Sequence, residues 1–204
     1  MQALSKMSKV TLEIERLLWM QGIGSIAGVD EAGRGPLAGP VVAASVIFPR
    51  DVLIEGVNDS KKISENQREK LYDVIRAQAL AVGVGIVGHE VIDRINILQA
   101  TILAMHKAID EMKGKPDFVI VDGNSFRHET LRFQNVIGGD AKSFTIAAAS
   151  IIAKVTRDRM MREFDHQYPN YGFAQHKGYG TQRHLDAIRE FGLCEIHRKT
   201  FHSI

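Results

Sequence analysis

The 204-residue sequence predicts an α/β fold in which one mixed sheet is flanked by helices. Segments with strand and helix patterns alternate along most of the chain, as they do in α/β domains. Residues 118–122 (FVIVD) form a short apolar run, which is typical of a strand covered on both faces in a parallel sheet. Residues 25–30 and 41–48 are two strand-like segments close enough along the chain to pair antiparallel. Parallel and antiparallel pairs are therefore expected in the same sheet.

The first half of the chain supplies three of the five predicted strands. Residues 12–20 (LEIERLLWM) have apolar side chains at helical spacing, and two glycines follow them. The strands at 25–30 (SIAGVD) and 41–48 (VVAASVIF) are separated by a loop rich in glycine and proline. Ser64 is a suitable cap for a helix over residues 65–79, and an apolar run at 80–87 predicts the third strand. That run contains the letters of a dinucleotide-binding fingerprint, but its glycines lie inside the strand pattern instead of after it.

The second half supplies the remaining strands and the longer helices. Helical patterns cover residues 89–96 and 97–112, and strands are predicted at 118–122 and 131–137. Gly138, Gly139 and Asp140 are expected to end the last strand. A long helix over 144–164, a loop rich in aromatic residues over 168–180, a last helix over 181–191 and a basic tail complete the chain. These segments form the predicted C-terminal helical region.

Composition limits the class of protein. Cys194 is the only cysteine, which excludes a disulfide scaffold and any multi-cysteine metal site. No apolar stretch approaches the ~18 residues that a membrane span requires. Residues 1–15 lack the pattern of a signal peptide. We therefore expect a cytoplasmic protein that does not associate with membranes.

Charge is distributed unevenly along the chain. The formal net charge is only +2, yet residues 141–204 carry 10 basic and 6 acidic side chains and five of the eight histidines. Residues 1–140 carry 16 basic and 18 acidic side chains. Such an imbalance occurs on polyanion-binding faces and also on ordinary solvated helices. The small net charge therefore does not exclude a nucleic-acid partner.

Acidic side chains lie at the ends of three predicted strands: Asp30 with Glu31, Asp122, and Asp140. Sites in open α/β sheets lie outside the carboxyl ends of the strands. If the four carboxylates gather there, each pair at ~4 Å repels by about 4 kcal/mol at an effective dielectric near 20. Protons or divalent cations would relieve that repulsion, and carboxylate ligands favour Mg²⁺ or Mn²⁺ over zinc. The pattern suits a two-metal phosphodiester hydrolase, although any single acid could instead form a turn or a helix cap.

Other candidate residues surround these acids in the sequence. Gly33, Arg34 and Gly35 follow the first two acids after one intervening alanine. They either bring their backbone close to a ligand or form a plain tight turn. Tyr179 is flanked by glycines and is either a stacking platform for a sugar or base, or a core side chain. Candidate phosphate contacts are Ser60, Lys61, Lys142, Lys154, Arg157 and Arg159, although a side chain of this kind, taken singly, is more often solvated or locally paired.

Five blocks of sequence, in order, resemble the type 2 ribonucleases H, the bacterial ribonuclease HII family. The first is residues 28–41 (GVDEAGRGPLAGPV), the second 59–62 (DSKK) and the third 121–124 (VDGN). The fourth joins 139–142 (GDAK) to 147–158 (AAASIIAKVTRD), and the fifth contains 176–181 (HKGYGT), with His197 and Arg198 near the end. The blocks extend over nearly the whole chain, which makes the resemblance specific.

The resemblance implies a ribonuclease H-like mixed five-stranded sheet in a catalytic domain over residues 25–204, with an N-terminal helical extension over 1–24. It implies metal-dependent cleavage of the RNA strand of RNA–DNA hybrids, and of single ribonucleotides in duplex DNA, leaving 3′-hydroxyl and 5′-phosphate ends. Two Mg²⁺ or Mn²⁺ ions and a monomeric chain are expected. The matching residues are Asp30, Glu31, Asp122 and Asp140 as catalytic metal ligands, the loop Gly33, Arg34 and Gly35 as the reader of the 2′-hydroxyl, and Tyr179 against the neighbouring deoxyribose.

Two other classes are compatible with the same residues. A metal-dependent nuclease that acts on DNA alone, such as a junction resolvase, would show a similar sheet and similar acids. A non-catalytic module that binds hybrids is the other alternative, although retention of all four acids argues against it.

Overall fold

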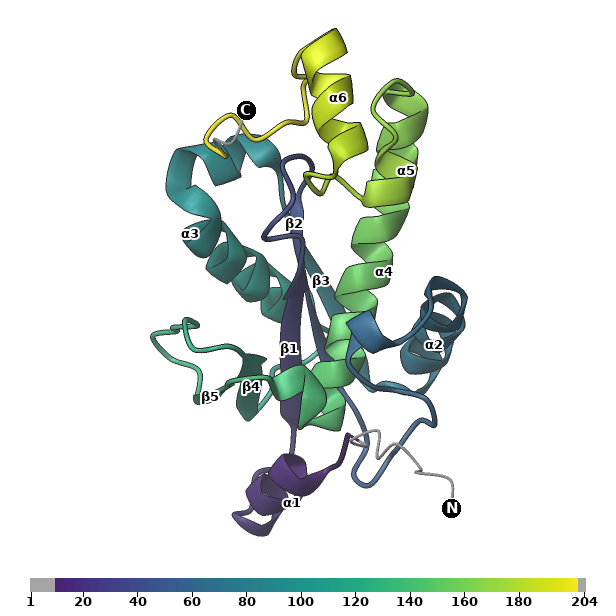
Figure 1. Ribbon diagram of the computed structural model, residues 1–204. Coiled ribbons are helices and arrows are strands. Elements are labelled where there is room, and N and C mark those ends of the chain that lie inside the picture. The colour runs from purple at the N-terminus through teal and green to yellow at the C-terminus, as the bar shows by residue number, and fades with distance from the viewer. Residues whose placement is uncertain (1–9, 202–204) are drawn as a thin grey trace, which may run out of the picture.

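The computed structural model describes residues 10–201 (Figure 1). Its core is one five-stranded sheet in the order β3-β2-β1-β4-β5. β1 pairs antiparallel with β2 and β2 with β3, whereas β1 with β4 and β4 with β5 are parallel pairs. The predicted mixed sheet of five strands is therefore confirmed. The strands are β1 (Ile26–Ala32), β2 (Val41–Ile47), β3 (Ala81–Val87), β4 (Phe118–Asp122) and β5 (Phe133–Val136).

Helices cover both faces of the sheet, because apolar side chains of β1 and β2 point alternately to either side. Val29 and Ala43 pack with α3 on one face, whereas Ala44 and Val46 pack with α2 and α4 on the other. Figure 1 shows α3 and α4 on opposite sides of the strands. The helices are α1 (Glu13–Met20), α2 (Glu65–Gln78), α3 (His89–Asp110), α4 (Phe144–Gln167), α5 (Phe173–His176) and α6 (Gln182–Phe191). Within residues 10–201, no helix is long and apolar enough to cross a membrane.

The glycines of β3 allow α3 to lie unusually close to the sheet. A Cβ atom added at Gly83 would lie 2.0 Å from the carbonyl oxygen of Ala108, and one at Gly85 would lie 1.9 Å from that of Ala104. Side chains at these positions would therefore push the helix away. The apparent dinucleotide fingerprint is a helix-packing feature of a strand, as its position inside the strand pattern predicts.

Some boundaries differ from the predicted ones. β1 continues through Glu31 and Ala32, so these residues are paired strand residues instead of loop. β5 ends at Val136, and the prediction that Asp140 lies at the end of this strand is wrong. Gly138 takes a left-handed conformation (φ 65°) that turns the chain into a short 3₁₀ helix, Gly139–Ala141, which carries Asp140. The predicted division of the helical region after residue 96 is confirmed by Asn96, whose φ of 67° breaks the helical backbone inside α3.

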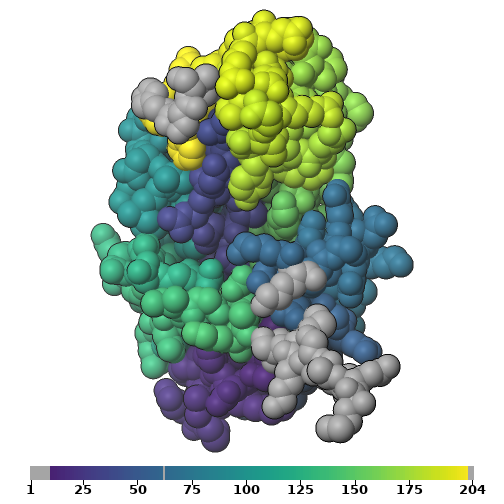
Figure 2. Space-filling model, viewed as in Figure 1, coloured from purple at the N-terminus to yellow at the C-terminus, as the bar shows by residue number. Residues whose placement is uncertain are grey.

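The C-terminal region forms a separate apolar cluster above the sheet. Met161 at the far end of α4 packs there with Phe173 of α5 and Ile188 of α6. Ala38, from the loop between β1 and β2, belongs to the same cluster. Figure 2 shows early-chain residues, in indigo, exposed between the teal, blue and yellow parts of the surface. The loop that follows the first two acids is therefore bordered by segments from distant parts of the sequence.

Candidate active site

The strand register brings the acids of β1 and β4 to one edge of the sheet. β1 and β4 run parallel with Val29 opposite Val121, and the next residues are Asp30 and Asp122. Asp140 reaches the same edge from the 3₁₀ helix before α4. The backbone N–H of Gly139 donates to Oδ1 of Asp122 at 2.7 Å, which joins this turn to the end of β4. Three separate elements thus bring together the four acids singled out in the sequence.

These carboxylates destabilise one another's charged forms. Asp30 is only 4% exposed, and burial, then the charges of Glu31 and Asp122, hold the pKa of Asp30 well above its ordinary value. Burial also raises the pKa of Asp140, with the charges of Asp122 and Asp59 as further causes. The pKa of Glu31 is raised by burial, although the Arg34 guanidinium opposes the shift. The site therefore holds more negative charge than its surroundings compensate.

Two cationic side chains partly offset this charge. Nη1 of Arg34 lies 3.3 Å from Oε1 of Glu31, and Nζ of Lys61 lies 3.7 Å from Oδ2 of Asp140. Lys61 remains 81% exposed, so its contribution is screened by water.

The chemistry of the donors fits a hard divalent cation, although the side chains are not arranged as a finished metal cage. Throughout residues 10–201, no group of three acidic, histidine or cysteine side chains is placed to hold a metal ion as it stands. Carboxylate oxygens are nevertheless the preferred ligands of Mg²⁺ and Mn²⁺, and such a cation would stabilise the charged form of Asp30 that burial and the charges of Glu31 and Asp122 disfavour.

A pocket of about 210 Å³ lies beside Asp30 and Glu31 and contains most of the predicted substrate contacts. Gly35 lies against Tyr179, since a Cβ atom on this glycine would be 3.6 Å from Cε1 of the tyrosine ring. Tyr179 is 46% exposed, so its ring is available to a ligand. The predicted contacts that line the pocket are Gly33, Arg34, Gly35, Ser60, Lys61, Lys154, Arg157 and Tyr179.

Lys142 is placed differently from the other candidates. It follows the turn that carries Asp140, and its Nζ donates to the carbonyl oxygen of Ile137 at 2.6 Å. Its side chain is exposed and does not line the 210 Å³ pocket.

The cationic side chains of α4 have local partners. Arg157 is fully buried and donates to the carbonyl oxygens of Pro40, Lys177 and Ala38 at 2.9, 2.9 and 3.1 Å. Of the two alternatives for Arg157, the locally paired group is therefore confirmed, because its guanidinium is bound to backbone carbonyls. Arg159 pairs with Glu69 at 2.5 Å, and Lys154, which lines the pocket, pairs with Asp158 at 2.6 Å.

Ser150 is a pocket residue that sequence reasoning overlooked. Its hydroxyl donates to Oγ of Ser60 at 2.7 Å, so the two serines hold α4 and the segment before α2 together beneath the acids. The available signal was its place as the one hydroxyl in a run of small apolar residues, 146–150.

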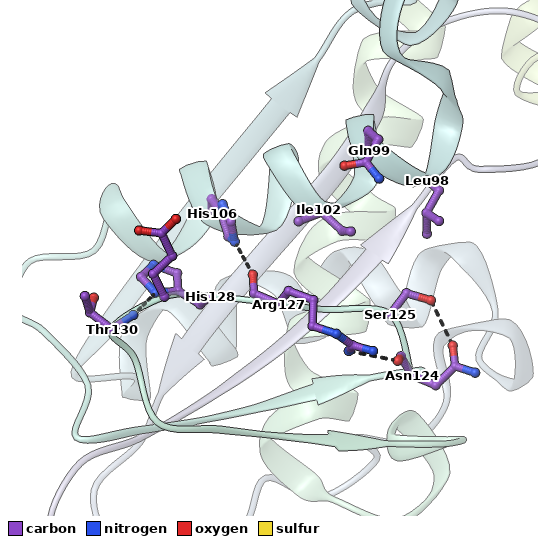
Figure 3. Close-up of a pocket in the computed structure, with 10 residues that line it drawn as sticks. Leu98, Gln99, Ile102, His106, Asn124, Ser125, Arg127, His128 and Thr130 are labelled. Atoms are coloured by element: carbon purple, nitrogen blue, oxygen red, sulfur yellow. Dashed lines mark hydrogen bonds between the residues drawn. The ribbon is translucent and has the colours of Figure 1, made fainter.

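A larger cavity lies elsewhere, between α3 and residues 124–130 (Figure 3). Its volume is about 880 Å³, and Leu98 and Ile102 of α3 lie across from Ser125 and Arg127. Nε2 of His106 lies 2.8 Å from the carbonyl oxygen of Arg127, which ties the segment to the helix. None of the four acids lines this cavity, so the larger volume of a cavity does not identify it as the active site.

A mixed sheet in this strand order, with carboxylates gathered at one edge, is the arrangement expected of a ribonuclease H-like nuclease. The family model described as Ribonuclease HII matches residues 27–204. The chain therefore belongs to the ribonuclease HII family.

Curated ribonucleases HII are similar in sequence to this chain over most of its length and of theirs. The ribonuclease HII of Acetivibrio thermocellus is 57% identical over 187 residues, which are 92% of this chain and 73% of the relative. That of Geobacter metallireducens is 55% identical over 190 residues, 93% of this chain and 89% of the relative.

Solved structures show the same fold. Ribonuclease H2 from Pyrococcus horikoshii superposes with a TM-score of 0.74 at 28% identity, covering 87% of this chain and 94% of that one. Ribonuclease HII of Archaeoglobus fulgidus, solved in complex with PCNA, gives a TM-score of 0.72 at 27% identity, covering 88% and 96%. Bst-RNase HIII, solved with Mn²⁺, matches at a TM-score of 0.62 and 18% identity over 82% of this chain and 63% of that one, which shows the fold alone.

The chain is accordingly an endonuclease of the ribonuclease H type that acts on RNA–DNA hybrids, and it belongs to a family of metal-dependent enzymes.

Proposed function

We propose that the chain cuts not only the RNA strand of RNA–DNA hybrids but also DNA duplexes at a single embedded ribonucleotide, leaving 3′-hydroxyl and 5′-phosphate ends. One observation carries the proposal: the loop Gly33–Gly35 and the exposed ring of Tyr179 border the same small pocket as Asp30 and Glu31. The residues that recognise one sugar would then lie next to the phosphate that reacts. The 2′-hydroxyl is the group by which a protein distinguishes RNA from DNA.

Each side of the pocket has a separate task in this proposal. Backbone groups of Gly33 and Gly35 approach the ribose, because glycine leaves room for a ligand at the backbone. The Arg34 guanidinium lies at the pocket mouth and can turn from Glu31 to a substrate phosphate. The Tyr179 ring offers a flat apolar surface to the next sugar, and Ser60, Lys61 and Lys142 contact the backbone of the strand.

Asp30, Glu31, Asp122 and Asp140 are the residues that would hold Mg²⁺ or Mn²⁺, with two ions expected when substrate is bound. Such ions would supply an activated water and stabilise the departing 3′-oxygen. The four carboxylates lie at this edge of the sheet because β1, β4 and the 3₁₀ helix Gly139–Ala141 carry them. We further propose that the chain acts as a monomer in the cytoplasm.

Three duplexes of identical sequence test the proposal: all DNA, DNA with one ribonucleotide, and an RNA–DNA hybrid. Each is incubated with Mg²⁺, with Mn²⁺ or with EDTA, and the products are mapped and their ends labelled. We expect cleavage of the hybrid and a single cut at the ribonucleotide, both abolished by EDTA. Cutting of the all-DNA duplex at the same rate would instead indicate a DNA nuclease, and binding without cutting a non-catalytic module.

A further inference from the structure

One buried guanidinium, that of Arg198 in the C-terminal tail, binds four carbonyl oxygens of the loop between β1 and β2. Nη2 donates to Gly33 at 2.6 Å and Nε to Gly39 at 2.9 Å, while Nη1 donates to Arg34 at 2.9 Å and to Pro36 at 2.8 Å. Arg198 is only 2% exposed. These carbonyls lie in a loop without a ladder of its own, so the guanidinium supplies partners that the backbone otherwise lacks.

The tail also contacts this loop through its backbone. The N–H of Gly39 donates to the carbonyl of Ile196, and the N–H of Arg198 donates to that of Leu37, both at 2.9 Å. Ala38 and His197 form an antiparallel bridge between these two bonds. The tail is thus paired with the loop at one isolated β-bridge, and the Arg198 side chain binds the same loop.

The neighbouring side chain, His197, leads to Tyr179 on the opposite side of the pocket. Nε2 of His197 lies 3.0 Å from Nε2 of His184, and Nδ1 of His184 lies 2.9 Å from the carbonyl oxygen of Tyr179. Both imidazoles are fully buried, and burial lowers the pKa of each, so both are neutral at pH 7.

The hydrogen positions in this chain follow from its partners. A carbonyl only accepts, so Nδ1 of His184 carries the hydrogen and Nε2 of His184 is an acceptor. Nε2 of His197 must then donate to it, which leaves Nδ1 of His197 to accept from the N–H of Cys194 at 2.9 Å. Every donor has an acceptor, so the tautomers and the two ring orientations are fixed together.

We propose that His197 and Arg198 are a pair of positioning residues that fixes both sides of the ribose-reading pocket, Arg198 through the carbonyls of residues 33–39 and His197 through His184 and the backbone of Tyr179. The inference deepens the proposed function, because it assigns the geometry of that pocket to a dipeptide about 160 residues distant in sequence from the loop. Neither side chain contacts substrate in this account.

Arg198→Lys is the decisive variant, since lysine retains the charge but cannot present donors to four carbonyls in a fixed fork. We expect single-turnover cleavage at a single ribonucleotide to fall about 10- to 100-fold, because small displacements of positioned groups cost that much. Affinity for the duplex should change less than threefold. Amide hydrogen exchange should increase in residues 33–39 of the free protein. Arg189→Lys, an exposed arginine of α6, is the matched control.

The histidine arm has its own test. His184→Asn retains an N–H near the position of Nδ1 and should preserve the rate at a single ribonucleotide better than His184→Leu, which cannot donate to Tyr179. We expect at least a fivefold difference between the two variants, with rates expressed per folded molecule. His166→Gln, at an exposed position of α4, is the control. Equal rates for the two His184 variants would overturn this arm, whether or not Arg198→Lys folds.

The outcomes separate this inference from the proposed function. If the wild-type chain makes no cut at a single ribonucleotide, the proposed function fails, yet hydrogen exchange still reports whether Arg198 holds the loop. If the wild type cuts there and Arg198→Lys shows wild-type exchange and wild-type rates, the positioning role is wrong. A loss of thermal stability with an unchanged rate per folded molecule would likewise contradict it, because it would show a purely structural role.

Discussion

Glu15 of α1 anchors the beginning of α4, and replacing it should cost the protein both stability and activity. The carboxylate is 1% exposed, and its Oε1 accepts from Oγ of Ser143 at 2.7 Å and from the N–H and Oγ1 of Thr145 at 3.0 and 2.8 Å. Its other oxygen is buried without a partner among the described residues. Three bonds to a charged acceptor stabilise the fold by ~1.5–3 kcal/mol each, and the unpaired oxygen offsets part of that gain.

Glu15→Ala should therefore lower the free energy of unfolding by about 2–4 kcal/mol, which corresponds to a Tm lower by roughly 5–15 °C for a chain of this length. Activity should fall as well, because Asp140 lies just before the anchored turn. Urea unfolding followed by circular dichroism measures the first effect, and cleavage per folded molecule the second. Glu13→Ala, an exposed acid of the same helix, is the control. A change of less than 0.5 kcal/mol for Glu15→Ala would refute this account of α1.

Three further predictions concern the pocket and its support. Asp30→Asn should abolish cleavage yet raise the Tm of the metal-free protein by about 2 °C or more, since it removes a buried charge that faces Glu31 and Asp122; a lower Tm in calorimetry would contradict this. Burial holds the pKa of His184 at about 4, below its ordinary value near 6.5, so the unfolded chain binds the extra proton between these values. The contribution of His184 to the unfolding free energy should thus be constant above pH 6.5 and should decline toward pH 4 by up to ~1.4 kcal/mol per pH unit. Urea titrations in which the stability of His184→Asn depends on pH as strongly as that of the wild type would show that His184 is not the cause. Tyr179→Ala should reduce cutting at a single ribonucleotide about tenfold more than cutting of a long hybrid, and equal losses on both substrates would remove the tyrosine from junction recognition.

The elements that determine the sheet could be predicted because their signals are local. Apolar runs mark β2 and β4, and the cap at Ser64 is formed as expected, with its Oγ accepting from the N–H of Gln67 at 3.3 Å. The acids were identifiable as a group for the same reason, since parallel strands β1 and β4 bring Asp30 and Asp122 to a common edge. Asp140 was associated correctly with this edge but assigned to the wrong element. The pattern of apolar residues does not show that Gly138 takes a left-handed conformation and turns the chain into a 3₁₀ helix.

The supporting residues could not be predicted because their partners are distant in sequence. Nothing near Arg157 in the chain indicates that its guanidinium binds the carbonyls of residues 38 and 40, more than a hundred positions away. An exposed and a buried arginine on a helix look alike in composition. The histidine chain from Cys194 to Tyr179 likewise exists only because α6 and the tail fold back together. Tertiary hydrogen bonds of this kind leave no spacing pattern in one sequence.

Single-turnover cleavage of a duplex with one ribonucleotide, measured for four conservative variants, tests the central claim most directly. The variants Asp30→Asn, Glu31→Gln, Asp122→Asn and Asp140→Asn each retain size and remove one charge from the proposed metal site. We expect each rate to fall by a factor of about 10² or more in Mg²⁺, with duplex affinity close to wild type. Cleavage within threefold of the wild-type rate by any one variant would contradict the assignment of that carboxylate. The same result for all four variants would show that these acids are not the catalytic site.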